Sequence, residues 1–191
     1  MPNAAAFFQA WAPYAQQVHA ATGVDTGVLL ALAAEETGYG TSALAAQYNV
    51  WSVKWTPEAP AGTTDQPGGF CGYPSPEAAV EDMIRVLSLP EYAAVRQAQG
   101  VQAQVAALVD SPYDGGTLAQ RRTWGHTILA VYAEQGLSQY DGPAGTAAPP
   151  GRVTTGPGMV TISDLPTMES TGPAVLALAL GALLVALIAS A

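Results

Sequence analysis

Two adjacent carboxylates, Glu35 and Glu36, end an apolar stretch that begins at Leu29. Glu36 follows Leu29 by seven residues, so on a helix the two share one face, and that face is otherwise apolar. Burial there disfavours the ionised carboxyl and raises its pKa, and the negative end of the helix dipole acts in the same direction. A carboxyl that keeps its proton near neutral pH is what a general acid for glycosidic cleavage requires. Glu35 also reaches the apolar side, so periodicity alone does not choose between the two glutamates.

The helix that presents these glutamates is predicted over residues 26–37. Asp25 or Thr26 can cap its first turn with a side-chain oxygen, and Gly38 suits the left-handed position after its last turn. A glutamate at a helix end is more often a solvated end residue than a catalytic acid, so the pair alone is a weak signal.

A series of short motifs follows in a fixed order. They are Glu36–Ser42 (ETGYGTS), Asn49–Lys54 (NVWSVK), Phe70–Asp82, Ser111–Asp114 (SPYD) and Leu137–Asp141 (LSQYD). The series resembles the bacterial glucosaminidase family (glycoside hydrolase family 73), which includes flagellar peptidoglycan hydrolases, autolysins and phage lysins. The corresponding pattern in that family is roughly E-S-G-W-G-x-S-x-L-A, then N-L-F-G-I-K, and the resemblance covers about residues 5–141.

The resemblance implies a mainly α-helical, lysozyme-like α+β domain over residues 1–141, with a small β-lobe that closes one side of a sugar cleft. It implies hydrolysis of the β-1,4 bond after N-acetylglucosamine in peptidoglycan glycan strands, with Glu36 as the catalytic acid. Tyr113 resembles the late tyrosine of the family. Glu58 or Asp65 in the lobe is a candidate for the second catalytic group, and the N-acetyl group of the substrate can assist in their place. The alternatives are a lytic transglycosylase and a non-catalytic membrane protein with a sugar-binding domain.

The sequence departs from the family pattern at several positions. Thr37 replaces a serine and Tyr39 a tryptophan, Trp51-Ser52 replaces Phe-Gly, and the late Ala-Thr is shortened to Asp114. The Thr, Tyr and Trp replacements keep the hydroxyl or aromatic character.

Substrate capture is expected from ring stacking and hydrogen bonds. The net charge is −9, and peptidoglycan also carries carboxylates, so charge does not attract the substrate. The candidate binding residues are Tyr39, Asn49, Trp51, Trp55 and Tyr73. For Trp51, Trp55 and Tyr73 the alternative is a place in the core of the lobe.

The other elements are predicted from periodicity and caps. Helices are expected over residues 4–21, 42–48, 75–87, 90–99, 101–109 and 117–135, strands over 50–55 and 70–73, and a loop over 57–69. Trp124 is expected to point inward from the last helix.

Composition excludes several classes of function. The sequence has six Lys and Arg residues against fifteen Asp and Glu residues, so it lacks the basic patch that binding to nucleic acid requires. The single cysteine, Cys71, excludes an internal disulfide. Neither His19 nor His126 has a Cys or His at ligand spacing, so no metal or other cofactor is expected.

The composition changes after residue 141. Residues 142–172 are rich in Pro, Gly and Thr and are predicted to form a linker. Residues 173–191 are predicted to form a transmembrane helix, because 174–191 contains no charged residue and would span roughly 27 Å as a helix. The chain is thus expected to be a membrane protein with a single C-terminal anchor in a lipid bilayer.

The start of the chain bears on localisation. Residues 1–12 lack the positive start and apolar segment of a secretory signal. An anchored wall hydrolase without such a signal fits a bacteriophage whose virion holds the enzyme on an internal membrane. A bacterial tail-anchored protein is the alternative.

Overall fold

The computed structural model describes residues 3–141. The predicted linker over residues 142–172 and the predicted transmembrane helix over 173–191 lie outside this described part. Within residues 3–141, no helix is both long enough and apolar enough to cross a membrane.

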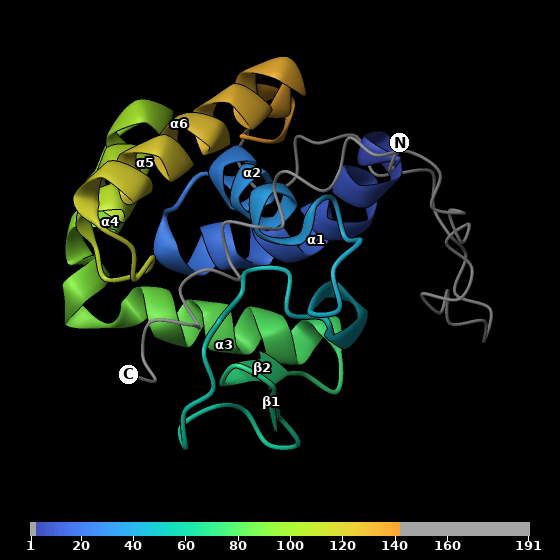
Figure 1. The fold of residues 1–191 in the computed structure, drawn as a ribbon. Coiled ribbons are helices and arrows are strands. Elements are labelled where there is room, and N and C mark those ends of the chain that lie inside the picture. The colour runs from blue at the N-terminus through green and yellow to red at the C-terminus, as the bar shows by residue number, and fades with distance from the viewer. Residues whose placement is uncertain (1–2, 142–191) are drawn as a thin grey trace. The chain divides into compact units, whose positions relative to one another are not determined.

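The described residues form a mainly helical domain with one small two-stranded sheet (Figure 1). The elements, in chain order, are α1 (Ala4–Thr22), α2 (Thr26–Thr37), the 3-10 turn η1 (Ala45–Gln47), β1 (Thr64–Gln66), β2 (Phe70–Gly72), α3 (Pro76–Ser88), η2 (Pro90–Tyr92), α4 (Ala93–Gln97), α5 (Val101–Asp110), α6 (Leu118–Glu134) and η3 (Leu137–Tyr140).

Helix α2 is the buried axis of this domain and confirms the helix predicted over residues 26–37. Every residue from Thr26 to Ala34 is buried, and the helix contacts α1, α5, α6 and η3. A helix that is apolar on all sides is stable only inside a core. The Asp141 carboxylate accepts a hydrogen bond of 2.6 Å from the Gly27 amide in the first turn, and Gly38 ends the helix at φ 57°. The end of α2 that holds the glutamates therefore emerges from a fixed core.

The long helices confirm the sequence predictions to within a few residues. Helix α1 continues through Pro13, and α3 begins with a side-chain cap, because the Ser75 hydroxyl accepts from the Ala78 amide at 3.3 Å. Two predicted helices are shorter than expected. The helix over 42–48 is only the turn η1, and the helix over 90–99 is divided into η2 and α4.

The β-lobe consists of β1 and β2, which pair antiparallel with Thr64 opposite Gly72. The strand predicted over residues 50–55 is wrong, because this segment forms turns and only Lys54 makes an isolated bridge, to Phe70. The predicted loop over 57–69 contains β1, and the predicted strand over 70–73 is confirmed as β2. Figure 1 shows the lobe beneath α3.

A buried asparagine shapes the segment before the lobe, in addition to two backbone hydrogen bonds that join Val53 to Cys71 and Trp55 to Gly69. The Asn49 side chain accepts from the Val53 amide at 2.8 Å and donates to the carbonyls of Val53 and Cys71 at 2.9 Å each. These bonds close residues 49–53 into a loop, which we call the Ser52 loop, and attach it to β2. Ser52 itself has a left-handed backbone, with φ 52°.

A buried carboxylate attaches the lobe to α3. Asp82 is fully buried and accepts from the Tyr73 hydroxyl at 2.7 Å and from the Cys71 thiol at 3.6 Å. On its other oxygen it pairs with Arg85 at 2.6 Å. Every acceptor oxygen of this buried charge therefore has a donor, as burial requires.

Helices α5 and α6 pack closely because residue 125 is glycine. A Cβ atom there would lie 2.5 Å from Cγ2 of Val109. The Arg121 guanidinium on α6 donates to the carbonyls of Val109 and Ser111 at 2.7 and 3.0 Å. These contacts fix α6 and the loop after α5 relative to each other.

Candidate active site

Glu36 lies in the last turn of α2 with its side chain half-buried. The indole Nε1–H of Trp124, on α6, donates to Glu36 Oε1 at 3.0 Å. Burial raises the pKa of the Glu36 carboxyl, and the negative charge of Asp114 acts in the same direction. Hydrogen bonding by the Ser52 hydroxyl and by Trp124 lowers the pKa, but the balance leaves it raised. The carboxyl therefore tends to keep its proton, as a general acid must.

Glu35 is the immediate neighbour of this carboxyl and is also half-buried. Its pKa is raised to about 7, first by burial and then by the charges of Glu36 and Asp114, while Trp124 lowers it. Adjacent carboxylates repel each other when both are ionised, so their titrations are coupled. Near neutral pH this end of α2 holds protons as well as negative charge.

Tyr113 joins the loop after α5 to the Ser52 loop. Its hydroxyl donates to the Trp51 carbonyl, and its ring stacks on Trp124 with centroids 6.0 Å apart and an interplanar angle of 22°. Burial, followed by the charge of Glu36, raises the pKa of Tyr113 well above 10. The phenol is therefore neutral, and the structure places it against the ring that contacts Glu36.

Three of the predicted sugar-binding residues are buried instead. Trp51 is only 1% exposed, donates its indole N–H to the Leu29 carbonyl at 3.1 Å, and packs against Trp11. Tyr73 is 5% exposed with its hydroxyl on Asp82. In Asn49, the side-chain oxygen and nitrogen bond the protein backbone. These side chains build the core and the Ser52 loop, so their burial argues against the expected contact with sugar.

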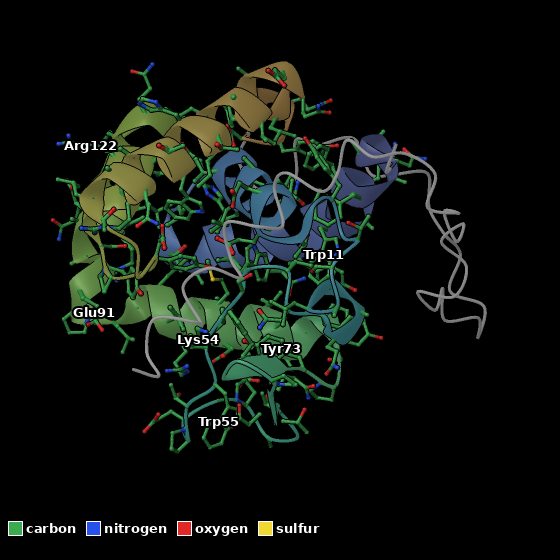
Figure 2. All side chains as sticks on the ribbon, in the orientation of Figure 1. Trp11, Lys54, Trp55, Tyr73, Glu91 and Arg122 are labelled. Carbon is green, nitrogen blue, oxygen red and sulfur yellow. The ribbon has the colours of Figure 1, made fainter. Side chains whose placement is uncertain are left out.

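Two predicted binding residues keep exposed or half-exposed surface. Trp55 is 39% exposed, and Figure 2 shows it at the outer edge of the β-lobe. Tyr39 is half-buried, has φ 59°, and presents its ring edge-on to Phe8 at 5.8 Å. Trp55 is thus the predicted aromatic residue with the most surface for ring stacking.

The two predicted lobe acids are on the surface of the protein. Glu58 and Asp65 are both exposed, and neither is hydrogen-bonded to Glu36. The Thr56 hydroxyl and the local backbone lower the pKa of Glu58. Both carboxyls are therefore solvated in this conformation.

Sequence reasoning missed Ser52 and Trp124 as neighbours of Glu36. Trp124 lies on the apolar face of α6 and was expected only to fill the core. Ser52 did give a signal, because it replaces a glycine of the family pattern, and the structure shows a positive φ at this position. Four segments thus meet at the end of α2: the last turn of α2 itself, the Ser52 loop, the loop after α5, and α6.

Comparisons with known proteins agree with this geometry. A family profile described as mannosyl-glycoprotein endo-beta-N-acetylglucosaminidase matches residues 12–137. No curated protein matches the chain. Among solved structures, a peptidoglycan hydrolase from Sphingomonas sp. A1 is similar, with 24% identity, a TM-score of 0.59, and coverage of 71% of this chain and 91% of that one.

Two further structures share the fold. The catalytic domain of the autolysin Auto from Listeria monocytogenes is 21% identical with a TM-score of 0.56, and the match covers 74% of this chain and 89% of that one. A type VI secretion system effector–immunity complex from Pseudomonas protegens contains a chain that is 23% identical with a TM-score of 0.54, and the match covers 70% of this chain and 94% of that one. At these low identities, the structural similarity shows a shared fold, and the family profile shows the family membership. The chain belongs to the glucosaminidase family of glycoside hydrolases.

Proposed function

We propose that this protein hydrolyses the β-1,4 bond after N-acetylglucosamine in peptidoglycan, with Glu36 as the general acid. The observation that carries the proposal is the half-buried Glu36 carboxyl at the end of α2, with its raised pKa and its hydrogen bond from Trp124. The substrate is inferred from the resemblance in fold to a peptidoglycan hydrolase and an autolysin.

In this mechanism, Glu36 protonates the leaving glycosidic oxygen as positive charge develops on the sugar ring. The protonated state is favoured at rest by burial and by the negative end of the α2 dipole. The N–H of Trp124 and the hydroxyl of Ser52 then stabilise the carboxylate that forms as the proton leaves.

A second group is needed beneath the ring. Glu58 and Asp65 remain the candidates from the lobe. Asp114 is a third candidate, because its charge already acts on Glu36. The substrate's own N-acetyl group is the alternative nucleophile. We expect Glu58→Gln, Asp65→Asn and Asp114→Asn to separate these possibilities by their kcat.

The proposal is tested by zymography on purified peptidoglycan with Glu36→Gln, and with Glu35→Gln as the matched control. We expect the wild type to clear the gel, Glu36→Gln to lose clearing, and Glu35→Gln to keep it. Mass spectrometry of the released fragments then identifies the bond. Fragments with N-acetylglucosamine at a reducing end support the proposal, whereas anhydro sugars indicate a lytic transglycosylase. Equal clearing by the wild type and Glu36→Gln would refute Glu36 as the acid.

We also propose that residues 173–191 anchor the enzyme in a lipid bilayer as a single-pass helix, after the linker over residues 142–172. The support is the run of eighteen residues without charge from 174 to 191. The hydrolase would then act from the internal membrane of a phage virion and open the cell wall during infection.

Liposome flotation tests the anchor. The full chain is expected to float with vesicles, and a Leu180→Arg and Leu183→Arg double variant is expected to stay in the soluble fraction, because charges at a helix centre oppose insertion. Flotation of both proteins would contradict the anchor. A zymogram band in the membrane fraction of purified virions would support the proposed location, and its absence would oppose it.

A further inference from the structure

We infer that Trp124 and Ser52 are positioning residues that hold the Glu36 carboxyl between them and determine which of its oxygens delivers the proton. The inference rests on the proposed role of Glu36 as the general acid. Neither residue is among the catalytic residues predicted from the sequence. Ser52 also departs from the family pattern, which has a glycine at this position.

The Trp124 contact fixes one oxygen of the carboxyl. An indole N–H can only donate, so Oε1 of Glu36 must accept at 3.0 Å whether the carboxyl is protonated or ionised. The transferable proton is therefore on Oε2. Trp124 is only 9% exposed and stacks on Tyr113, so the donor has little freedom to turn away.

The Ser52 contact depends on an unusual backbone. A serine at φ 52° is held in a region that non-glycine residues seldom occupy. The loop that holds it is fixed on both sides of Ser52, because Asn49 bonds Val53 and the Tyr113 hydroxyl donates to the Trp51 carbonyl. Strained conformations that their surroundings enforce cluster at functional sites. Here the strained residue lies close enough to Glu36 for its hydroxyl to lower the pKa of that carboxyl.

The hydroxyl of Ser52 and the indole N–H of Trp124 differ in whether they can both donate and accept a hydrogen bond. The Ser52 hydroxyl can rotate, so it can accept from a protonated carboxyl and donate to the carboxylate. Trp124 donates in both states. Both donors favour the ionised carboxyl, which is the form that exists after proton transfer. Other titratable groups that act on this carboxyl are Glu35, Asp114 and Tyr113, and none of them supplies a fixed donor to it.

The test measures the titration of Glu36 directly, by carbon-13 NMR of the labelled carboxyl in the full chain, and the pH dependence of kcat/KM on peptidoglycan. The variants are Trp124→Phe, which keeps a ring on Tyr113, and Ser52→Ala and Ser52→Gly. Ser52→Gly also relieves the positive φ, so it separates loss of the hydroxyl from backbone strain. Trp55→Phe and Ser88→Ala are matched controls for the titration, for the loss of an exposed indole and of a hydroxyl elsewhere.

We expect Trp124→Phe and both Ser52 variants to raise the pKa of Glu36 by about one pH unit, because each removes a hydrogen bond to a charged group. The basic limb of the kcat/KM profile should move upward by the same amount, with kcat lower by about tenfold and KM nearly unchanged. The controls should leave the titration where the wild type has it.

An unchanged titration in Trp124→Phe or in both Ser52 variants would overturn the role of that residue. A wild type that titrates as expected but does not cleave peptidoglycan would refute the proposed function and leave the positioning of the carboxyl intact. The two failures are therefore distinguishable.

Discussion

Replacing Glu35 by glutamine should change how the stability of this domain depends on pH. In the folded protein the pKa of Glu35 is raised from 4.5 to about 7, chiefly by burial. Between those two values the folded state therefore binds more protons than the unfolded chain. Folding stability falls as pH rises through this window, because stability rises with pH only where the unfolded state binds more protons.

The magnitude follows from the same two values. One pH unit corresponds to 1.36 kcal/mol, so a rise from 4.5 to about 7 corresponds to at most about 3 kcal/mol of unfolding free energy. Glu35 is half-buried, and solvent screening reduces the expected loss to about 1–2 kcal/mol. Glu35→Gln cannot ionise and should not lose this amount between pH 4.5 and about 8.

Urea unfolding followed by far-UV circular dichroism measures the effect across this pH range. The wild type should lose stability relative to Glu35→Gln as pH rises, whatever constant offset separates the two proteins. Glu81→Gln, which alters an exposed glutamate of α3, should run parallel to the wild type. Parallel curves for the wild type and Glu35→Gln would refute the argument that burial holds a proton on this side chain.

Two further predictions follow from the geometry. Gly125→Ala should lower the unfolding free energy by about 1–3 kcal/mol, because its Cβ would lie 2.5 Å from Val109 and push α5 and α6 apart. It should also lower activity by moving the adjacent Trp124. Gly115→Ala, which has nothing within 4 Å, should be nearly neutral in the same urea titration. Trp55→Ala should raise KM for peptidoglycan, because it removes the predicted aromatic residue with the most exposed surface for ring stacking, 39%. An unchanged KM would remove Trp55 from the binding surface.

The helices were predictable because their signals are local. The cap at Ser75, the glycine after Thr37 and the apolar run of α2 lie within a few residues of the features that they determine. In a short segment such as the one after Ser42, the same local signals predict a longer helix than the structure contains.

The segment from Val50 to Trp55 could not be predicted in this way. Its alternating apolar residues have the pattern of a half-buried strand. In the structure, the segment meets β2 at an isolated bridge at Lys54, and its turns are held by the buried amide of Asn49, which bonds Val53 and Cys71. Cys71 lies far along the chain from Asn49, and no local pattern reports such a contact.

In the candidate site, too, residues within a sequence motif could be predicted and residues brought in from distant segments could not. Glu36 was identified from a motif, but Trp124 is far from it in sequence and looks like any core tryptophan on α6. Alternation also failed to separate Trp51, which is in the core, from Trp55, which is exposed. Burial of an aromatic ring is decided by the tertiary structure, so sequence supplies the set of rings and not their roles.

The bond between Trp124 and Glu36 has an optical consequence. A change in charge on a carboxyl 3.0 Å from an indole nitrogen changes the electric field across that chromophore. The emission of Trp124, isolated by replacing the other three tryptophans with phenylalanine and Glu35 with glutamine, would then follow the ionisation of Glu36 as an intrinsic fluorescent indicator. The protonation state of the catalytic carboxyl could then be followed in real time, without any label or substrate.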